Sequence, residues 1–155
     1  VHRAENTDDP ERLKGIFKAL AEIGKETAVV IPMHPRTKKY LEKYNIELPS
    51  SIVVLNPVGY MEMLYLLKNC QVVLTDSGGL QKEAYFFKKF CVTLREETEW
   101  VELVEHGVNL LVGSNYPKIM DAFIMASSAK VDFDKDLYGK GDASDIIISC
   151  LLKYS

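Results

Sequence analysis

The stretch Cys70-Gln71-Val72-Val73-Leu74-Thr75-Asp76-Ser77-Gly78-Gly79-Leu80-Gln81-Lys82-Glu83 decides the fold of this chain. Its first part, Cys70 to Thr75, is a short apolar run that is typical of a buried strand, and the pattern from Leu80 to Phe87 is helical. A strand that turns directly into a helix through two glycines predicts a βα unit. The first N–H groups of such a helix have no partner within the helix and form a binding site for an anion.

The residues of this turn favour a nucleoside diphosphate as the anion. Gly78 and Gly79 let a ligand approach the backbone closely, and Ser77 adds a hydroxyl group. Glu83 lies four residues after Gly79 and shares its helix face. A carboxylate beside a phosphate repels it, unless a group such as a ribose diol lies between the two. Two simpler interpretations stay open: a tight turn in which Asp76 or Ser77 only caps the helix, and a solvated Glu83.

Strand and helix patterns alternate along the rest of the chain. Short apolar runs predict strands at 27–33, 51–55, 70–75, 91–94 and 109–112. Helical patterns occur at 10–23, 37–44, 60–69, 80–87, 100–106, 117–127 and 143–153, the first starting at Asp8-Asp9-Pro10 and ending at Gly24. This alternation predicts an α/β fold, a Rossmann-like doubly wound parallel sheet with helices on both faces. The length of 155 residues fits one domain, 1–155.

In a doubly wound sheet, ligands lie beyond the carboxyl ends of the strands. The loops expected there carry polar residues that suit a site: 34–36, 56–59, 76–79 and 95–99. The amino terminus raises a second expectation. The segment from Val1 to Asn6 runs into a helix start with no strand before it, so we expect Val1 to continue a strand that belongs to a longer chain.

Composition argues against several function classes. The net charge is −3 and the basic residues are scattered, which does not favour nucleic acid as a partner. No apolar run has the length of a membrane span, and no signal-peptide pattern opens the sequence. The three cysteines, Cys70, Cys91 and Cys150, match no metal or disulfide spacing and are interpreted as reduced core residues of a cytoplasmic protein. His2, His34 and His106 show no ligand spacing, so no metal site and no cofactor are expected.

Five motifs occur in an order that resembles a known family. They are His2-Arg3-x-Glu5-Asn6, Pro32-x-His34-Pro35, Thr75-Asp76-Ser77-Gly78-Gly79-x-Gln81-x-Glu83-Ala84, Arg95-x-x-Thr98-Glu99 and Tyr138-Gly139-x-Gly141-x-Ala143-Ser144. Over essentially its whole length, the chain resembles the C-terminal half of the non-hydrolysing UDP-N-acetylglucosamine 2-epimerases. That family has the two-domain glycosyltransferase-B architecture, with the active site between two Rossmann-like domains.

The resemblance implies roles for residues at matching positions. Ser77, Gly78 and Gly79 would bind the diphosphate, and Glu83 the ribose hydroxyls. His2 matches a histidine that lies near the diphosphate and is implicated in turnover, so it is the candidate catalytic residue.

Further matches extend the implied site. Met63, which lies 14 residues before Ser77, matches a position lining the uracil pocket. Arg95 and Glu99 match a loop that faces the cleft, and His34 is a candidate for the same neighbourhood.

The family reaction inverts C2 of the sugar through elimination and re-addition of UDP, and the resemblance implies that the proton-transferring carboxylates belong to an N-terminal domain. The implied partners are a UDP-sugar, that second domain and a second copy of the chain. We therefore expect this chain alone to be inactive.

One departure from the family pattern puts the sugar in question. After Thr98-Glu99 the family more often has Arg-Pro-Glu, whereas this chain has Trp100-Val101-Glu102. That variant is similar to relatives that act on modified UDP-N-acetyl sugars such as diacetamido uronic acids. Two further alternatives are the donor-binding domain of a glycosyltransferase and a non-catalytic nucleotide-sugar-binding module.

Overall fold

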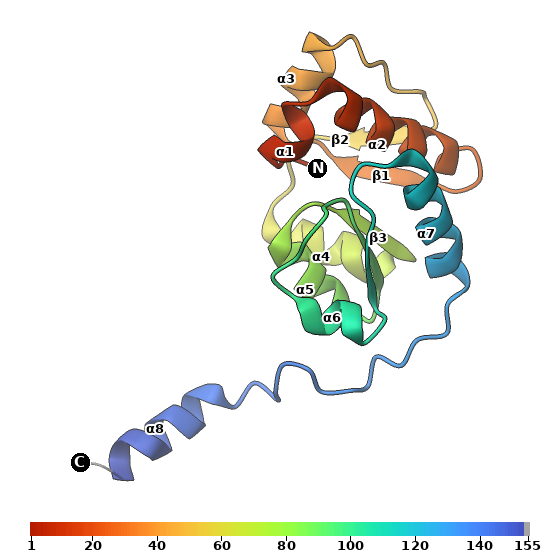
Figure 1. Cartoon of the computed structure of the whole chain (residues 1–155). Coiled ribbons are helices and arrows are strands. Elements are labelled where there is room, and N and C mark those ends of the chain that lie inside the picture. The colour runs from red at the N-terminus through yellow and green to blue at the C-terminus, as the bar shows by residue number, and fades with distance from the viewer. Residues whose placement is uncertain (154–155) are drawn as a thin grey trace.

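The computed structural model describes residues 1–153, and its elements alternate as an α/β protein (Figure 1). The strands are β1 (Val29–Pro32), β2 (Ile52–Leu55), β3 (Val72–Thr75), β4 (Phe90–Thr93) and β5 (Asn109–Leu111). The helices are α1 (Ala4–Thr7), α2 (Pro10–Ile23), α3 (Pro35–Lys43), α4 (Tyr60–Asn69), α5 (Gly78–Phe86), α6 (Val101–Glu105), α7 (Tyr116–Ser128) and α8 (Ala143–Lys153).

Local signals explain where the long helices begin and end. The carboxylate of Asp9 accepts hydrogen bonds from the N–H groups of Glu11 and Arg12, and Pro10 occupies the first helical position of α2. The helix ends at Gly24, as expected. The helical pattern predicted at 10–23 has its apolar residues buried: Leu13, Ile16, Phe17, Leu20 and Ile23. Sequence alone did not predict α1, which has only four residues.

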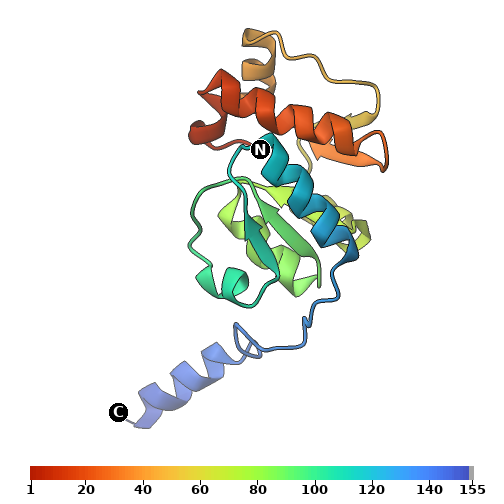
Figure 2. The ribbon, with the colours of Figure 1, turned by 45° about the vertical axis from the view of Figure 1, so that its right-hand side comes forward.

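The strands are all parallel but form two sheets. β1 pairs with β2 in one sheet, and the other has the order β3-β4-β5. The predicted α/β class with parallel sheet pairing is therefore confirmed, but the single continuous sheet is not. Among residues 1–153 no strand joins β1 to β3. The amino terminus lies between the two sheets in both ribbon views, where Val1 packs against the main core (Figures 1 and 2).

Side chains of the three-stranded sheet alternate between two cores, which places helices on both of its faces. Phe90, Val92 and Leu94 belong to the main core, together with α2 and α7. Val73 and Cys91 point the other way, into a smaller core with Leu67 of α4 and Ala84 of α5. Because successive strand residues face opposite sides, this division follows directly from the pleat.

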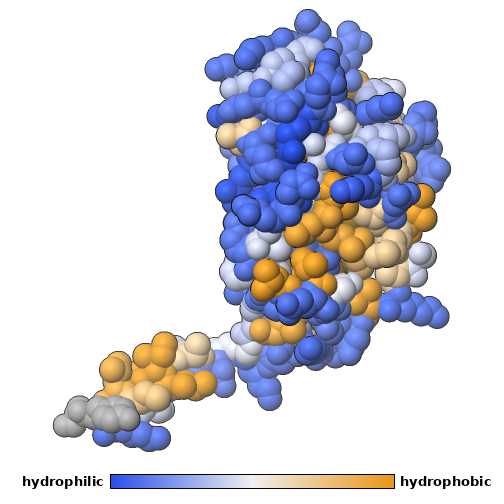
Figure 3. Space-filling view, in the orientation of Figure 1, coloured by the Kyte–Doolittle hydropathy of each residue, from blue (hydrophilic) through white to orange (hydrophobic). Residues whose placement is uncertain are grey.

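The last helix stands apart from the rest of the molecule. Residues 129–142 lead away from α7, and α8 extends beyond the main body (Figures 1 and 2). Its side chains are exposed and give it an apolar surface (Figure 3). The prediction that all three cysteines lie in the core is wrong for Cys150, which is exposed on α8, and Cys70 is only half-buried. Cys91 is buried, and burial raises its pKa to about 12.

Candidate functional site

The turn between β3 and α5 has the geometry expected of an anion site. Thr75 ends the strand, and its hydroxyl oxygen accepts a hydrogen bond of 3.0 Å from the N–H of Ser77. α5 begins at Gly78, so both glycines lie in its first turn, and the side chain of Ser77 makes no capping bond. A Cβ atom on Gly79 would meet no other atom within 4 Å. The backbone at Gly79 is therefore open to an approaching ligand.

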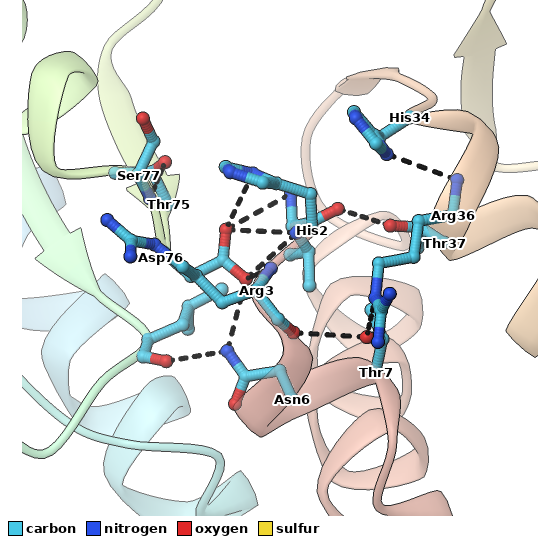
Figure 4. A network of polar contacts seen from close by, with 12 residues as sticks. His2, Arg3, Asn6, Thr7, His34, Arg36, Thr37, Thr75, Asp76 and Ser77 are labelled. Carbon is cyan, nitrogen blue, oxygen red and sulfur yellow. Dashed lines mark hydrogen bonds and ion pairs between the residues drawn. The ribbon is translucent and has the colours of Figure 1, made fainter.

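Asp76 does not cap α5; it binds the amino-terminal segment. Its carboxylate is fully buried and accepts hydrogen bonds from the N–H of His2 at 3.0 and 2.9 Å and from the N–H of Arg3 at 2.9 Å. The amide of Asn6 adds a bond of 3.2 Å to Asp76 and one of 2.9 Å to the carbonyl oxygen of Leu94. Figure 4 shows His2 between Asp76 and the α3 residues Arg36 and Thr37, while the carbonyl of Arg3 accepts a hydrogen bond from Thr7 of α1.

Electrostatics keep Asp76 ionised. Burial alone would raise its pKa, but the amino terminus and the N–H groups of Arg3 and His2 outweigh that effect and hold the pKa below its ordinary value. A buried carboxylate with this many donors is a strong structural clamp. The interpretation of Asp76 as a helix cap is thus replaced by a long-range role, because its partners are 70 to 74 residues away in the sequence.

The structure brings two of the predicted histidines together beside this clamp. Nδ1 of His2 lies 3.3 Å from Asp76 Oδ1, and the ring centroids of His2 and His34 are 5.3 Å apart. His34 also caps α3, since its Nδ1 accepts the N–H of Arg36 at 3.1 Å. Burial, together with the amino terminus, His34 and Arg3, lowers the pKa of His2 against the opposing effect of Asp76. His2 is therefore predominantly neutral at pH 7.

The loop after β4 reaches the same turn. Arg95 is buried and donates from Nη1 to both carboxylate oxygens of Glu99 at 3.0 Å. Glu99 Oε2 lies 3.2 Å from the position that a Cβ on Gly78 would occupy. The N–H of Glu99 itself and the guanidinium of Arg95 lower the pKa of Glu99. The loop 95–99 was expected at the carboxyl ends of the strands, and this geometry places Glu99 beside Gly78 of the glycine turn.

One neighbour of the turn was missed in the sequence. Arg3 belongs to the motif His2-Arg3-x-Glu5-Asn6, and its Nη2 lies 3.8 Å from the Cβ position of Gly78. The available signal was its position directly after His2. Glu83 is half-buried on α5, and Met63 is half-buried in the first turn of α4; their assigned contacts with a nucleotide stay predictions.

Residues 1–153 contain neither a cluster of metal-ligating side chains nor a membrane-spanning helix. No group of three or more histidine, cysteine, aspartate or glutamate side chains there is arranged to hold a metal ion. No helix in the same range is long and apolar enough to cross a membrane.

Comparisons with known proteins identify relatives over nearly the whole chain. The model of the UDP-N-acetylglucosamine 2-epimerase family matches residues 1–152. A UDP-2,3-diacetamido-2,3-dideoxy-D-glucuronate 2-epimerase from Pseudomonas aeruginosa is 49% identical over 154 residues, which are 99% of this chain and 43% of that protein.

Solved structures give the same result. The UDP-GlcNAc 2-epimerase of Methanocaldococcus jannaschii superimposes with a TM-score of 0.88 at 41% identity, covering 99% of this chain and 44% of that one. The same enzyme in complex with UDP-GlcNAc and UDP superimposes with a TM-score of 0.86. The chain thus spans less than half the length of these relatives.

Proposed function

The chain belongs to the UDP-N-acetylglucosamine 2-epimerase family, and we propose that it is the UDP-binding, C-terminal half of such an enzyme. The observation that carries the proposal is the open start of α5 at Gly78 and Gly79, with His2 held beside it by Asp76. Unpaired N–H groups at the start of a helix attract a phosphate group through both hydrogen bonds and the helix dipole.

In the proposed complex, the diphosphate of UDP binds at Ser77, Gly78 and Gly79. Glu83 accepts hydrogen bonds from the ribose hydroxyls one turn further along α5, and Met63 lines the uracil pocket. The guanidinium of Arg3, next to Gly78, supplies a positive charge for the diphosphate. Glu99 lies equally close, but its charge is balanced by the bidentate contact with Arg95.

The proposed contribution to catalysis is stabilisation of the departing diphosphate. As the bond between C1 of the sugar and UDP breaks, negative charge grows on the diphosphate oxygens, where helix N–H groups and Arg3 offset it. With its lowered pKa, the imidazole of His2 is not a proton donor at pH 7, but its N–H can donate a hydrogen bond to a diphosphate oxygen of the leaving group. The carboxylates that move the C2 proton are assigned to the N-terminal half of the enzyme.

The split sheet supports a two-domain enzyme of glycosyltransferase-B architecture. β1 and β3 are each paired on one side, and Val1 lies between their sheets. A further parallel strand between β1 and β3 would give the order β2-β1-strand-β3-β4-β5, the arrangement of a doubly wound sheet. The enzyme is proposed to act in the cytoplasm, where cysteines remain reduced.

A second candidate substrate is a UDP-linked diacetamido uronic acid. Two observations favour it: the 49% identity to the Pseudomonas aeruginosa protein, and Trp100-Val101-Glu102 at a position where the family more often has Arg-Pro-Glu. This alternative changes the sugar and leaves the proposed UDP contacts as they are.

Calorimetric titration of the 155-residue chain tests the proposal. We expect UDP to bind and uridine to bind more weakly, because the α5 start contacts only the phosphates. Competition between UDP-N-acetylglucosamine and UDP-2,3-diacetamido-2,3-dideoxyglucuronate then ranks the two sugars. If UDP shows no advantage over uridine, the glycines form only a tight turn and the proposal is wrong.

A further inference from the structure

Two carbonyl groups at the start of α5 accept hydrogen bonds from side chains. The indole Nε1–H of Trp100 donates to the carbonyl oxygen of Gly78 at 2.8 Å, and Nε2 of Gln81 donates to that of Ser77 at 3.3 Å. A peptide group is planar and trans, so its N–H points opposite to its C=O. In addition to the helix backbone, the bond from Trp100 therefore restrains the direction of the N–H of Gly79, and the bond from Gln81 restrains that of Gly78.

Trp100 is itself held in place from several sides. The ring of Tyr138 packs edge-on against the indole, with centroids 5.9 Å apart. The ammonium group of Lys82 lies 4.6 Å from the centroid of the indole and 4.2 Å from that of Tyr138, which adds attraction between cation and ring. The main-chain N–H of Trp100 donates to the hydroxyl oxygen of Thr98 at 3.1 Å.

Gln81 anchors this arrangement in the sheet. Its side chain is fully buried, and Oε1 accepts bonds from Thr98 Oγ1 at 2.6 Å and from Asn109 Nδ2 at 3.0 Å. Asn109 in turn accepts a bond of 2.8 Å from the hydroxyl of Thr93. Strands β4 and β5, the loop that precedes α6 and the first turn of α5 are thus joined by one buried polar network, and such satisfied networks make a site rigid.

We propose that Trp100 is a positioning residue for the diphosphate. It holds the Gly78 carbonyl so that the N–H of Gly79 is oriented before the ligand arrives, with Gln81 as its support. This inference rests on the proposed UDP site. It gives a function to the residue at which this chain departs from the more common family sequence, and it requires no contact between the indole and the nucleotide.

Substitution of Trp100 tests the hydrogen bond. Trp100→Phe keeps an aromatic ring beside Lys82 and Tyr138 but removes the N–H donor. We expect UDP to bind roughly threefold to tenfold more weakly, the range for losing one hydrogen bond, while uridine binding stays unchanged. Trp100→Arg restores a donor and should recover part of the affinity. Tyr138→Phe, which keeps the ring and the indole bond, is the matched control and should bind UDP as the wild type does.

A measurement on the wild-type chain does not depend on how the variants fold. Trp100 is the single tryptophan, so the chain gives one indole N–H signal in a ¹H–¹⁵N spectrum. Because that N–H is bonded to the Gly78 carbonyl, we expect UDP to shift the signal and uridine to leave it in place. If calorimetry shows UDP binding while the indole signal does not move and Trp100→Phe binds equally well, the positioning role is refuted and the UDP site stands. If UDP does not bind at all, both proposals fail.

Discussion

At the scale of single residues, Asp76 links the three-stranded sheet to the amino-terminal segment, which lies between the two sheets (Figures 1 and 2). It directly follows β3 and binds the backbone of His2 and Arg3 at the amino terminus. A buried carboxylate that accepts several N–H bonds is costly to remove, because each donor is then left without a partner in a region that water does not reach. The stability of the candidate site therefore depends on a residue that is not expected to touch the ligand.

We expect Asp76→Asn to lower the free energy of unfolding by about 2–4 kcal/mol, measured by urea denaturation at pH 7. Asparagine keeps the size of the side chain but lacks its charge and one acceptor oxygen. The control is Asp134→Asn, which alters a solvent-exposed carboxylate paired with Lys88 and should leave stability close to that of the wild type. Equal stability of the Asp76 variant would show that the amino-terminal segment does not need this clamp.

The lowered pKa of Asp76 predicts that the free energy of unfolding depends on pH. The pKa of Asp76 is lower in the folded chain than in the unfolded one. Its stabilisation is therefore fully present above the unfolded aspartate pKa of about 4, and is lost as the pH falls through the lower, folded-state pKa. Urea denaturation between pH 7 and pH 2 should show a steeper acid loss for the wild type than for Asp76→Asn. Parallel curves for the two chains would contradict the assignment.

Substitution of Gly79 distinguishes a ligand-binding site from a simple tight turn. A methyl group there meets no atom of the chain within 4 Å, so Gly79→Ala should fold at least as stably as the wild type. It would nevertheless occupy the space through which a phosphate reaches the helix N–H groups, and a clash of this kind costs about 1–3 kcal/mol. We expect UDP affinity, measured by calorimetry, to fall by about tenfold. Unchanged affinity with unchanged stability would favour the tight-turn interpretation.

At the scale of elements, α2 packs closely on the segment that follows β5. A Cβ on Gly15, in the middle of α2, would lie 2.6 Å from the carbonyl oxygen of Ser114. Alanine normally stabilises a helix interior relative to glycine, by up to about 1 kcal/mol. Here we expect the opposite sign: Gly15→Ala should lose about 1–3 kcal/mol of unfolding free energy, because backbone must move. The neighbouring exposed change Lys14→Ala is the control; a stabilised Gly15→Ala would refute this packing.

The elements also show what the sequence could predict. The limits of α4 and α8 match their predicted ranges, because helical periodicity is a local property. The glycine turn and its place at the carboxyl end of β3 were predictable for the same reason. The four-residue α1 was not, since it is too short for a periodic signal and is held by Asp76 from far along the chain. The hydrogen bond from Trp100 to Gly78 joins residues 22 positions apart, so no local sequence pattern predicts it.

At the scale of the whole molecule, we propose that the chain forms one side of an active site. The carboxylates described near the turn already have partners or another assigned role: Asp76 accepts the N–H groups of His2 and Arg3, Glu99 pairs with Arg95, and Glu83 is assigned to the ribose. Inversion at C2 requires a base on one face of the sugar and an acid on the other. We propose that this pair belongs to the other half of the enzyme. Without that half, water reaches the site and weakens each electrostatic contact.

We therefore expect the 155-residue chain to bind UDP without turning over a UDP-sugar. The test is proton NMR of UDP-N-acetylglucosamine in deuterium oxide, which follows the C2 proton, with the diacetamido uronate substrate run in parallel. Neither exchange at C2 nor the epimer should appear, although calorimetry on the same sample shows an occupied site. The full-length Methanocaldococcus jannaschii UDP-GlcNAc 2-epimerase serves as the positive control for the assay. Exchange catalysed by the purified chain would mean that its own residues supply the proton-transferring pair, and that the division of labour between the two halves is wrong.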